Sequence, residues 1–268
     1  MVDGIQRAMK LADGSNGVAV NVSGLRTQFG STVIHDQLNL EIKEGEVFGI
    51  VGGSGSGKSV LMRAMIGLIR PTDGRIHVFG HDTQCSGPEM EELRRQWGVM
   101  FQDGALFSSL TVGENVEVPL KEHTRLKAAE RRDVIALKLC VAGLELSARD
   151  KYPSELSGGM RKRAGLARAL ALDPRIVFLD EPTAGLDPVS AARFDELIIS
   201  LQDTLGLTVV MITHDLDTLH ATCNRVGVLL NKRAITGTVE QLAERNEPWL
   251  REYFRGPRGR AAAYAKEY

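Results

Sequence analysis

The chain has 268 residues, 43% of them hydrophobic, which is enough for one large domain or two lobes around a core. Its 33 basic and 34 acidic side chains leave a net charge of −1, so charge gives no argument for nucleic acid or an anionic membrane surface as a partner. The three cysteines are widely spaced and form no C-x-x-C pair, which argues against a disulfide framework or a zinc site and fits a reducing compartment.

Residues 1–17 contain glycines and polar residues with little periodicity, and we expect them to form a flexible N-terminal lead. They lack the apolar core of a signal peptide, and no run of 18 apolar residues occurs in the sequence. We therefore expect a protein that is cytosolic or peripheral to a membrane and does not span it.

Two kinds of strand are predicted. Alternating apolar residues over Val18–Val22 and Leu38–Ile42 predict a small antiparallel sheet. The short continuous apolar runs Val47–Val51, Ile176–Leu179 and Val209–Ile212 are typical of strands in the centre of a parallel sheet. The chain is therefore predicted to have an α/β core.

A glycine-rich segment between the first buried strand and the predicted helix Val60–Ile66 matches the phosphate-loop pattern G-x-x-x-x-G-K-[ST]. It consists of Gly52, Gly53, Ser54, Gly55, Ser56, Gly57, Lys58 and Ser59. In such a loop, backbone N–H groups and the helix N-terminus surround the phosphates of a nucleotide. Lys58 is expected to reach the β- and γ-phosphates, and the Ser59 hydroxyl to bind Mg²⁺. The alternative is a glycine-rich turn that precedes Lys-Ser by chance.

Helical spacing with charged outer faces follows over Glu89–Gln96, Lys127–Ala142 and Met160–Ala171, while Gly98–Leu110 is predicted to be a loop region. The stretch from about residue 88 to 165 is therefore interpreted as a mostly helical insert in the α/β core.

Two segments near this insert are candidates for nucleotide contact. Gln102 lies where the core meets the insert, and its amide could contact Mg²⁺ or water as well as the insert. Ser157, Gly158 and Gly159 precede a predicted helix, so their N–H groups would form a second anion site, with a plain helix cap as the alternative.

One phosphate loop already saturates a triphosphate, so we predict a head-to-tail dimer in which each copy offers Ser157 to the other copy's ATP. ATP would close this dimer, and hydrolysis would reset it.

Asp180 and Glu181 end a buried strand, where doubly wound sheets bind ligands. Beside a phosphate loop, Asp180 is expected to hold Mg²⁺ through water, and Glu181 to act as the general base for the attacking water. His214 follows the next apolar strand and would donate a hydrogen bond to the γ-phosphate, with a structural histidine as the alternative. Asp187 follows the carboxylates closely and is placed at the seam of the dimer.

In chain order, these motifs resemble those of the nucleotide-binding subunits of ABC transporters. The resemblance implies a RecA-like P-loop core with an antiparallel β subdomain and a helical ABC subdomain. It divides the chain into the lead at 1–17, an ABC ATPase domain at 18–243 and a C-terminal tail at 244–268. It also implies ATP and Mg²⁺ as cofactors, ATP hydrolysis coupled to transport, and a membrane permease bound at the groove around the Gln102 loop. Phe29 matches the aromatic residue that stacks on adenine in this family.

A narrower resemblance concerns the cargo. Gly98–Leu110 and Ser157–Arg163 are similar to segments in the ATPases of lipid transporters that work with MCE-domain proteins, among them the Mla phospholipid system of Gram-negative envelopes. Many other ABC ATPases carry a glutamine-rich segment where this chain has Met160-Arg161-Lys162-Arg163. The resemblance implies phospholipid transport for outer-membrane lipid asymmetry, from the cytoplasmic face of the inner membrane. The implied partners are a second copy of the chain, a permease (MlaE-like), an MCE lipid-binding protein (MlaD-like) and often a STAS-domain protein (MlaB-like), without nucleic acid.

Three alternatives are weighed against this interpretation. The same module could serve another solute, because the residues that hydrolyse ATP touch only the nucleotide. A soluble non-transport ABC protein is a second alternative; a single cassette without a heptad run or C-x-x-C pair argues against translation and repair ATPases, but not against an iron–sulfur assembly factor. A GTP-binding switch would need an Asn-Lys-x-Asp string, and Asn231-Lys232-Arg233 lacks the aspartate.

The predicted tail carries Trp249, Tyr253 and Phe254 among several arginines. We hypothesise that these aromatic residues dock on a neighbouring subunit, and a frayed terminus is the alternative.

Overall fold

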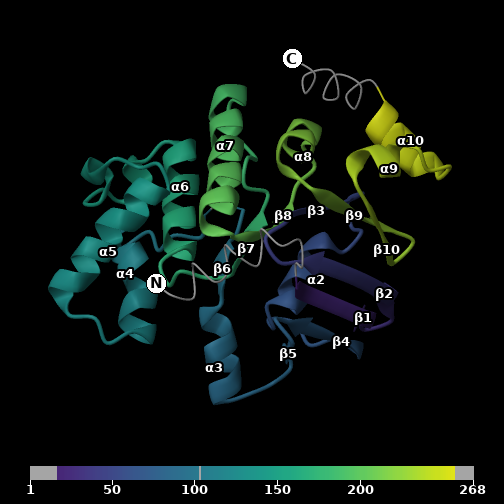
Figure 1. Ribbon diagram of the computed structural model, residues 1–268, viewed down its shortest axis with the longest axis horizontal. Coiled ribbons are helices and arrows are strands. Elements are labelled where there is room, and N and C mark those ends of the chain that lie inside the picture. The colour runs from purple at the N-terminus through teal and green to yellow at the C-terminus, as the bar shows by residue number, and fades with distance from the viewer. Residues whose placement is uncertain (1–16, 103, 257–268) are drawn as a thin grey trace.

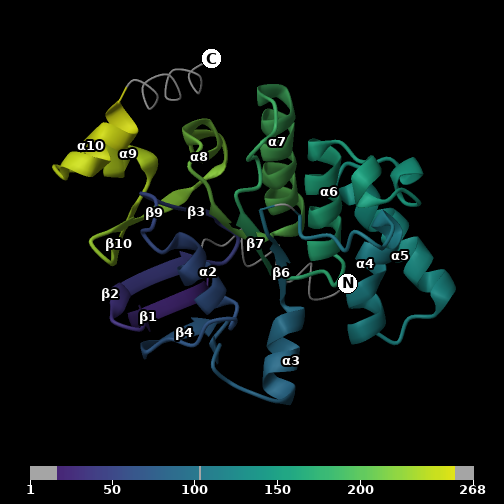
Figure 2. The ribbon, with the colours of Figure 1, turned by 180° about the vertical axis from the view of Figure 1, so that it is seen from behind.

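The structure, a computed structural model, describes residues 17–102 and 104–256. Apart from Gly17, the predicted flexible lead lies outside the described residues. Two sheets form the centre of the described part. The helices α4, α5 and α6 lie at one end of its longest axis, and α9 and α10 lie at the other (Figures 1 and 2).

The first sheet is antiparallel, with strand order β2-β1-β4-β5. Its two long strands, β1 (Val18–Phe29) and β2 (Thr32–Lys43), confirm the antiparallel pair predicted from alternating residues. Both strands extend further than the alternation indicated. The sheet is completed by β4 (Asp73–Val78) and the short β5 (His81–Asp82).

The second sheet has the order β10-β9-β3-β8-β7-β6 and is parallel except for its edge strand β10. Its strands are β3 (Val47–Gly52), β6 (Trp97–Met100), β7 (Ile176–Asp180), β8 (Thr208–Ile212), β9 (Arg225–Leu230) and β10 (Arg233–Gly237). Every residue of β7 and β8 is buried, as their continuous apolar runs predicted.

The register of this sheet brings three loops to one edge. Ile212 of β8 lies beside Ile50 of β3 on one side and beside Asp180 of β7 on the other. Because these strands are parallel, the segments that follow them leave the sheet at the same edge. The phosphate loop, the carboxylate pair and the loop with His214 are therefore neighbours.

The prediction of a loop over Gly98–Leu110 is wrong at its start. Trp97–Met100 form β6, which pairs with β7 from Ile176 to Leu179. A four-residue strand is too short to show an alternation of apolar and polar residues, and Gly98 interrupts its apolar run. That glycine is needed for packing, because a Cβ there would lie 2.1 Å from the carbonyl oxygen of Ala169 in α6. Gln102 therefore follows a core strand closely.

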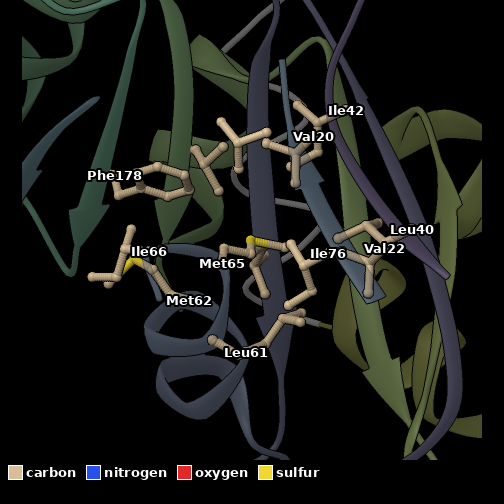
Figure 3. Close-up of a cluster of buried hydrophobic side chains, with 14 of the residues drawn as sticks. Val20, Val22, Leu40, Ile42, Leu61, Met62, Met65, Ile66, Ile76 and Phe178 are labelled. Atoms are coloured by element: carbon tan, nitrogen blue, oxygen red, sulfur yellow. The ribbon is translucent and has the colours of Figure 1, made fainter. Parts of the chain in front are cut away.

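Helix α2 (Lys58–Met65) begins inside the phosphate loop and packs between the two sheets. Leu61, Met62 and Met65 of this helix are fully buried. Figure 3 shows them beside Ile76 of the antiparallel sheet and Phe178 of the parallel sheet, in one hydrophobic cluster. This cluster fixes the helix N-terminus relative to the strand ends that carry the site.

The predicted helices of the insert are confirmed as α3 (Pro88–Arg95), α5 (Ala128–Val141) and α6 (Gly158–Ala169). The sequence did not predict α4 (Val112–His123), which starts at a capping box and contains an internal proline. Two short 3₁₀ turns, η1 (Leu146–Ala148) and η2 (Pro153–Glu155), connect α5 to α6. Helices α4, α5 and α6 share a hydrophobic cluster that is separate from that of the sheets.

The C-terminal part contains α7 (Pro188–Leu205), α8 (Leu216–Thr222), α9 (Val239–Ala243) and α10 (Pro248–Arg255). Helix α10 lies within the predicted tail, and its Leu250 and Phe254 are buried against Val51 and Leu219 of the same chain. The hypothesis that Trp249, Tyr253 and Phe254 dock on a neighbouring subunit is therefore wrong for Phe254, whose ring packs in its own core. It stays a hypothesis for Trp249 and Tyr253. Residues 257–268 of the predicted tail lie outside the described residues.

We expect Phe254→Ala to lower the free energy of unfolding by about 3–5 kcal/mol, because Phe254 is only 4% exposed. Phe107→Ala is the matched control, since that ring is 52% exposed. It should change the free energy by less than about 1 kcal/mol. Urea unfolding monitored by circular dichroism would measure both, and equal losses would contradict the packing of α10 described here.

Over the part of the chain that the structure describes, we find no helix with the length and apolar character needed to cross a bilayer.

Candidate active site

The phosphate loop connects β3 to α2 and leaves an open face. A Cβ at Gly53 or Gly55 would meet no described atom within 4 Å. Gly57, by contrast, has φ +95°, and a Cβ there would lie 2.5 Å from Nε2 of the buried His35 and 2.5 Å from Cγ2 of Ile34. The loop is therefore closely supported from the antiparallel sheet and open on the side that a phosphate would approach.

Lys58 lies back over this loop. Its Nζ donates hydrogen bonds to the carbonyl oxygens of Gly52, at 2.8 Å, and Gly53, at 3.2 Å. Burial lowers the pKa of Lys58, and the carboxylates of Glu181 and Asp180 oppose that shift. The Lys58 ammonium thus lies between the loop and the carboxylate pair. Because a phosphate carries more negative charge than a carbonyl oxygen, the ammonium could exchange its carbonyl partners for a bound phosphate.

Asp180 and Glu181 stand at the end of β7, as the sequence indicated. The Asp180 side chain is buried, and burial and the adjacent Glu181 carboxylate raise its pKa, against the opposing charges of Arg63, Lys162 and Lys58. A bound cation would favour the charged form of this carboxylate.

Glu181 adopts a left-handed backbone, with φ +50°. Such a conformation is uncommon for a residue with a side chain and is often found at functional sites. Its N–H donates to the carbonyl oxygen of Ile212 at 2.9 Å, and its Oε2 lies 2.8 Å from Nδ1 of His214. The structure therefore joins the predicted base and the predicted histidine directly.

The loop of His214 is held by the C-terminal helix. The imidazole of His214 is 73% exposed, but its backbone carbonyl oxygen accepts a hydrogen bond from the Tyr253 hydroxyl at 3.4 Å. Burial raises the pKa of Tyr253 to about 12, so the phenol stays protonated and able to donate at neutral pH. Sequence reasoning missed this role, although the i, i+4 spacing of Leu250 and Phe254 was a signal for an amphipathic helix there.

Gln102 joins the site through its backbone. Its carbonyl oxygen accepts a hydrogen bond from Nζ of Lys162, which also donates to the carbonyl oxygen of Glu181 at 2.9 Å. Sequence reasoning noted Lys162 only as a departure from a glutamine-rich pattern, because nothing in the sequence shows that this lysine is buried.

Ser157, Gly158 and Gly159 form the start of α6. The Ser157 hydroxyl accepts a hydrogen bond from the Met160 N–H at 3.3 Å, so it does cap the helix. The two glycines are nevertheless open, since only Leu186 would approach a Cβ there, at 3.7 and 4.0 Å. Along the longest axis of the molecule, α6 and α2 lie on opposite sides of β7 (Figure 1). The structure thus does not bring α6 to the phosphate loop of its own chain.

Asp187 and Phe29 are the two remaining predicted residues. Asp187 caps α7 by accepting a hydrogen bond from the Ser190 N–H at 3.0 Å. Hydrogen bonds from the side chain and then the backbone of Ser190 lower the pKa of Asp187. Phe29 ends β1 and is 51% exposed, so one face of its ring is available for stacking.

The residues predicted to hold Mg²⁺ supply a hydroxyl from Ser59, an amide oxygen from Gln102 and a carboxylate from Asp180. This all-oxygen set suits Mg²⁺, which keeps several waters and takes further ligands from phosphates. Among the described residues there is no group of three or more His, Cys, Asp or Glu side chains that could hold a metal ion. Any Mg²⁺ here would therefore depend on the nucleotide for part of its shell.

These features define a P-loop ATPase. They are a phosphate loop with its lysine, a carboxylate pair at the end of the adjoining strand, and a histidine in contact with the second carboxylate. The chain belongs to the ABC transporter family, whose profile matches residues 35–184. It is an ATP-binding and ATP-hydrolysing transporter subunit.

Three relatives carry different transport names. The probable ribonucleotide transport ATP-binding protein mkl of Mycobacterium leprae is 43% identical over 244 residues, which cover 90% of this chain and 70% of mkl. The intermembrane phospholipid transport system ATP-binding protein MlaF of Haemophilus influenzae is 37% identical over 239 residues, covering 88% of this chain and 90% of MlaF. The methionine import ATP-binding protein MetN of Geobacillus kaustophilus is 41% identical over 207 residues, covering 77% of this chain and 60% of MetN.

Solved structures confirm the predicted fold class. One is a dimeric structure of the ATP-binding cassette MJ0796 in a post-hydrolysis state, bound to ADP and Pi. It superposes with a TM-score of 0.75 and 32% identity, and the aligned region covers 82% of this chain and 98% of the MJ0796 chain. The other is cbiO1 of Clostridium perfringens, part of the ABC transporter complex cbiONQ. It superposes with a TM-score of 0.77 and 32% identity, and the aligned region covers 93% of this chain and 99% of the cbiO1 chain.

Proposed function

We propose that this chain powers phospholipid transport for outer-membrane lipid asymmetry, on the cytoplasmic face of the inner membrane. The observation that carries the proposal is the match to MlaF along nearly the whole of both chains, 88% of this one and 90% of MlaF. MetN, by contrast, is matched over only 60% of its length. The segments Gly98–Leu110 and Ser157–Arg163 support the same assignment through their resemblance to lipid-transport ATPases.

In the proposed hydrolysis step, Glu181 removes a proton from the water that attacks the γ-phosphate. His214, in contact with Glu181, donates a hydrogen bond to the transferring group, and Lys58 stabilises the charge on the β- and γ-phosphates. Ser59, Asp180 and Gln102 would hold Mg²⁺, which would supply charge neutralisation when bound.

We propose that two copies pair head to tail. The open first turn of α6, with Ser157, Gly158 and Gly159, would meet the ATP bound by the other copy, and Asp187 would lie at the seam. The placement of α6 and α2 on opposite sides of β7 supports this arrangement (Figure 1), as does the dimeric state of MJ0796. ATP bound by both chains would hold the pair closed, and loss of the γ-phosphate would release it.

The proposed permease site is a groove of about 360 Å³ between β6, α4 and the end of α2. Its apolar lining includes Leu68, Trp97, Phe101, Phe107, Val118 and Pro119. Leu68 and Phe107 are 61% and 52% exposed and line the same groove, and contiguous exposed apolar surface is typical of protein interaction sites. Phe101 adjoins Gln102, so a protein segment seated in the groove would touch the loop that leads to the ATP site.

An MCE lipid-binding protein and a STAS-domain protein complete the proposed assembly. The test is to purify the Glu181→Gln chain from its native membranes in mild detergent with ATP, and to identify copurifying proteins and lipids by mass spectrometry. The same purification from cells lacking the chain is the control. A permease with an MCE protein and phospholipid is the expected result. A permease with a ribonucleotide or amino-acid binding partner would overturn the cargo while leaving the ATPase assignment intact.

We expect Phe29→Ala to weaken ATP binding by about 5- to 100-fold, because a base stacked on an aromatic ring gains roughly 1–3 kcal/mol. Phe29→Tyr keeps the ring and should bind ATP within about 2-fold of the unmodified chain. Titration with a fluorescent ATP analogue would measure both. Unchanged affinity in Phe29→Ala would remove Phe29 from the proposed site.

A further inference from the structure

Lys162 is a lysine buried among the loops of the active site. It lies on α6, its side chain is only 6% exposed, and lysine is rarely buried unless it is paired. Its ammonium donates to the carbonyl oxygens of Gln102 and Glu181, which follow the neighbouring strands β6 and β7. One side chain of the helix that begins at Ser157 therefore binds two loops of the core sheet.

The loop after Gln102 is also attached to α6. Arg168 of the helix donates to the carbonyl oxygens of Gly104, at 3.1 Å, and Ala105, at 2.5 Å. A Cβ at Gly165 would lie 2.9 Å from the Cα of Gly104, so the loop and the helix are in close backbone contact. Of the cations in these contacts, Lys162 is the one that also reaches Glu181.

The contact with Glu181 concerns the strained part of the site. The Glu181 backbone is left-handed, its N–H is held by the carbonyl oxygen of Ile212, and its own carbonyl oxygen is held by Lys162. A hydrogen bond from an ammonium group is stronger than one between neutral groups. The peptide groups on both sides of the Glu181 side chain are thus fixed, and with them the direction of its carboxylate toward His214.

We propose that Lys162 is a positioning residue for ATP hydrolysis, which ties the backbone of Glu181 and Gln102 to the helix that begins at Ser157. The proposal rests on the roles proposed above for these three residues. In the proposed dimer, Ser157 of one copy contacts the ATP bound by the other copy. A shift of α6 caused by that contact would reach Lys162, and through it Glu181, the general base for the ATP bound by the first copy. The Ser157 contact with one ATP and the general base at the other ATP are then coupled through the ammonium group of Lys162.

The test compares Lys162→Met and Lys162→Gln in the full chain, purified with its membrane partners. Methionine keeps the length and apolar stem but cannot donate, whereas the glutamine amide can donate to a carbonyl oxygen. We expect kcat to fall by about 10- to 100-fold in Lys162→Met and by less in Lys162→Gln. ATP affinity should stay within about 3-fold in both variants, because Lys162 donates to backbone carbonyl oxygens and is not placed against the nucleotide.

Lys138→Met is the matched control, because Lys138 of α5 is also 6% exposed and is paired with a carboxylate, that of Asp173, outside the site. It should lower the melting temperature but leave kcat within about 2-fold. Equal losses of kcat in Lys162→Met and Lys138→Met would overturn the proposal, as would parallel losses of kcat and ATP affinity in Lys162→Met.

If Lys162→Met does not fold, Lys162→Gln remains as the variant that can still donate. It is then compared with Lys162→Leu, which like methionine cannot donate. A kcat that is lower in Lys162→Leu than in Lys162→Gln, at unchanged ATP affinity, supports the positioning role, and equal kcat in the two variants overturns it. Failure of the underlying assignment has a different signature, since a Glu181→Gln chain that still turns over ATP would remove Glu181 as the base whatever the Lys162 variants do.

Discussion

Replacing Glu181 by glutamine is expected to lower ATP turnover by about 10²- to 10⁴-fold while ATP stays bound. Glutamine has the same shape as glutamate but cannot accept the proton of the attacking water. The side chain is largely buried and faces His214 at 2.8 Å, so the substitution removes the base without opening a cavity. Phosphate release would measure turnover, and titration with a fluorescent ATP analogue would measure binding.

Glu117→Gln is the control for this experiment. Glu117 belongs to α4 and pairs with Lys121 and Arg131, which lower its pKa, so it is a charged carboxylate outside the site. Its replacement should leave turnover within about 2-fold, because Glu117 and its two partners lie in the helical insert and take no part in the proposed hydrolysis step. If Glu181→Gln kept more than about a tenth of the turnover, another group would have to be the base.

The Gly57→Ala variant is expected to lose ATP binding by more than about 100-fold. A left-handed alanine costs roughly 1–2 kcal/mol, and here the new methyl group would also meet His35 and Ile34 at 2.5 Å. Both neighbours lie in β2 and His35 is fully buried, so the loop has to move instead. A displaced loop no longer directs its N–H groups at the phosphates.

Gly80→Ala separates these two effects. Gly80 has φ +83°, but a Cβ there would meet no described atom within 4 Å, so only the backbone cost applies. That variant should bind ATP normally and be less stable by roughly 1–2 kcal/mol. Calorimetric titration with ATP and thermal unfolding would distinguish them, and normal ATP binding by Gly57→Ala would contradict the close support of the loop by the antiparallel sheet.

Much of the site could be predicted from the sequence because its chemistry lies at strand ends. The glycines before Lys58 and the carboxylates after Leu179 each follow a continuous apolar run, and such runs mark buried parallel strands without any knowledge of tertiary contacts. The register that places Asp180 beside Ile212 then brings these ends together.

What could not be predicted depends on packing between distant segments. The strand at Trp97 is defined by its pairing with β7, and the internal Pro119 weakens the helical pattern of α4. In the sequence, Lys162 and Lys138 look like two ordinary charged residues. Both are nevertheless buried, because Lys162 can donate to the carbonyl oxygen of Glu181 and Lys138 can pair with the carboxylate of Asp173. A preference for the surface is overridden only where the fold supplies such partners.

The order of strands in the parallel sheet has a consequence for how the protein is made. The strand that leads into the phosphate loop, β3, lies between β8 and β9, which both belong to the last quarter of the chain. On the ribosome, Val47–Gly52 therefore emerge long before either neighbour exists, as an apolar strand with both edges unpaired. Pairing over such a sequence separation is slow, and an unpaired apolar strand is exposed to aggregation until its partners arrive. The phosphate loop can then reach its final position only after β8 and β9 have been synthesised.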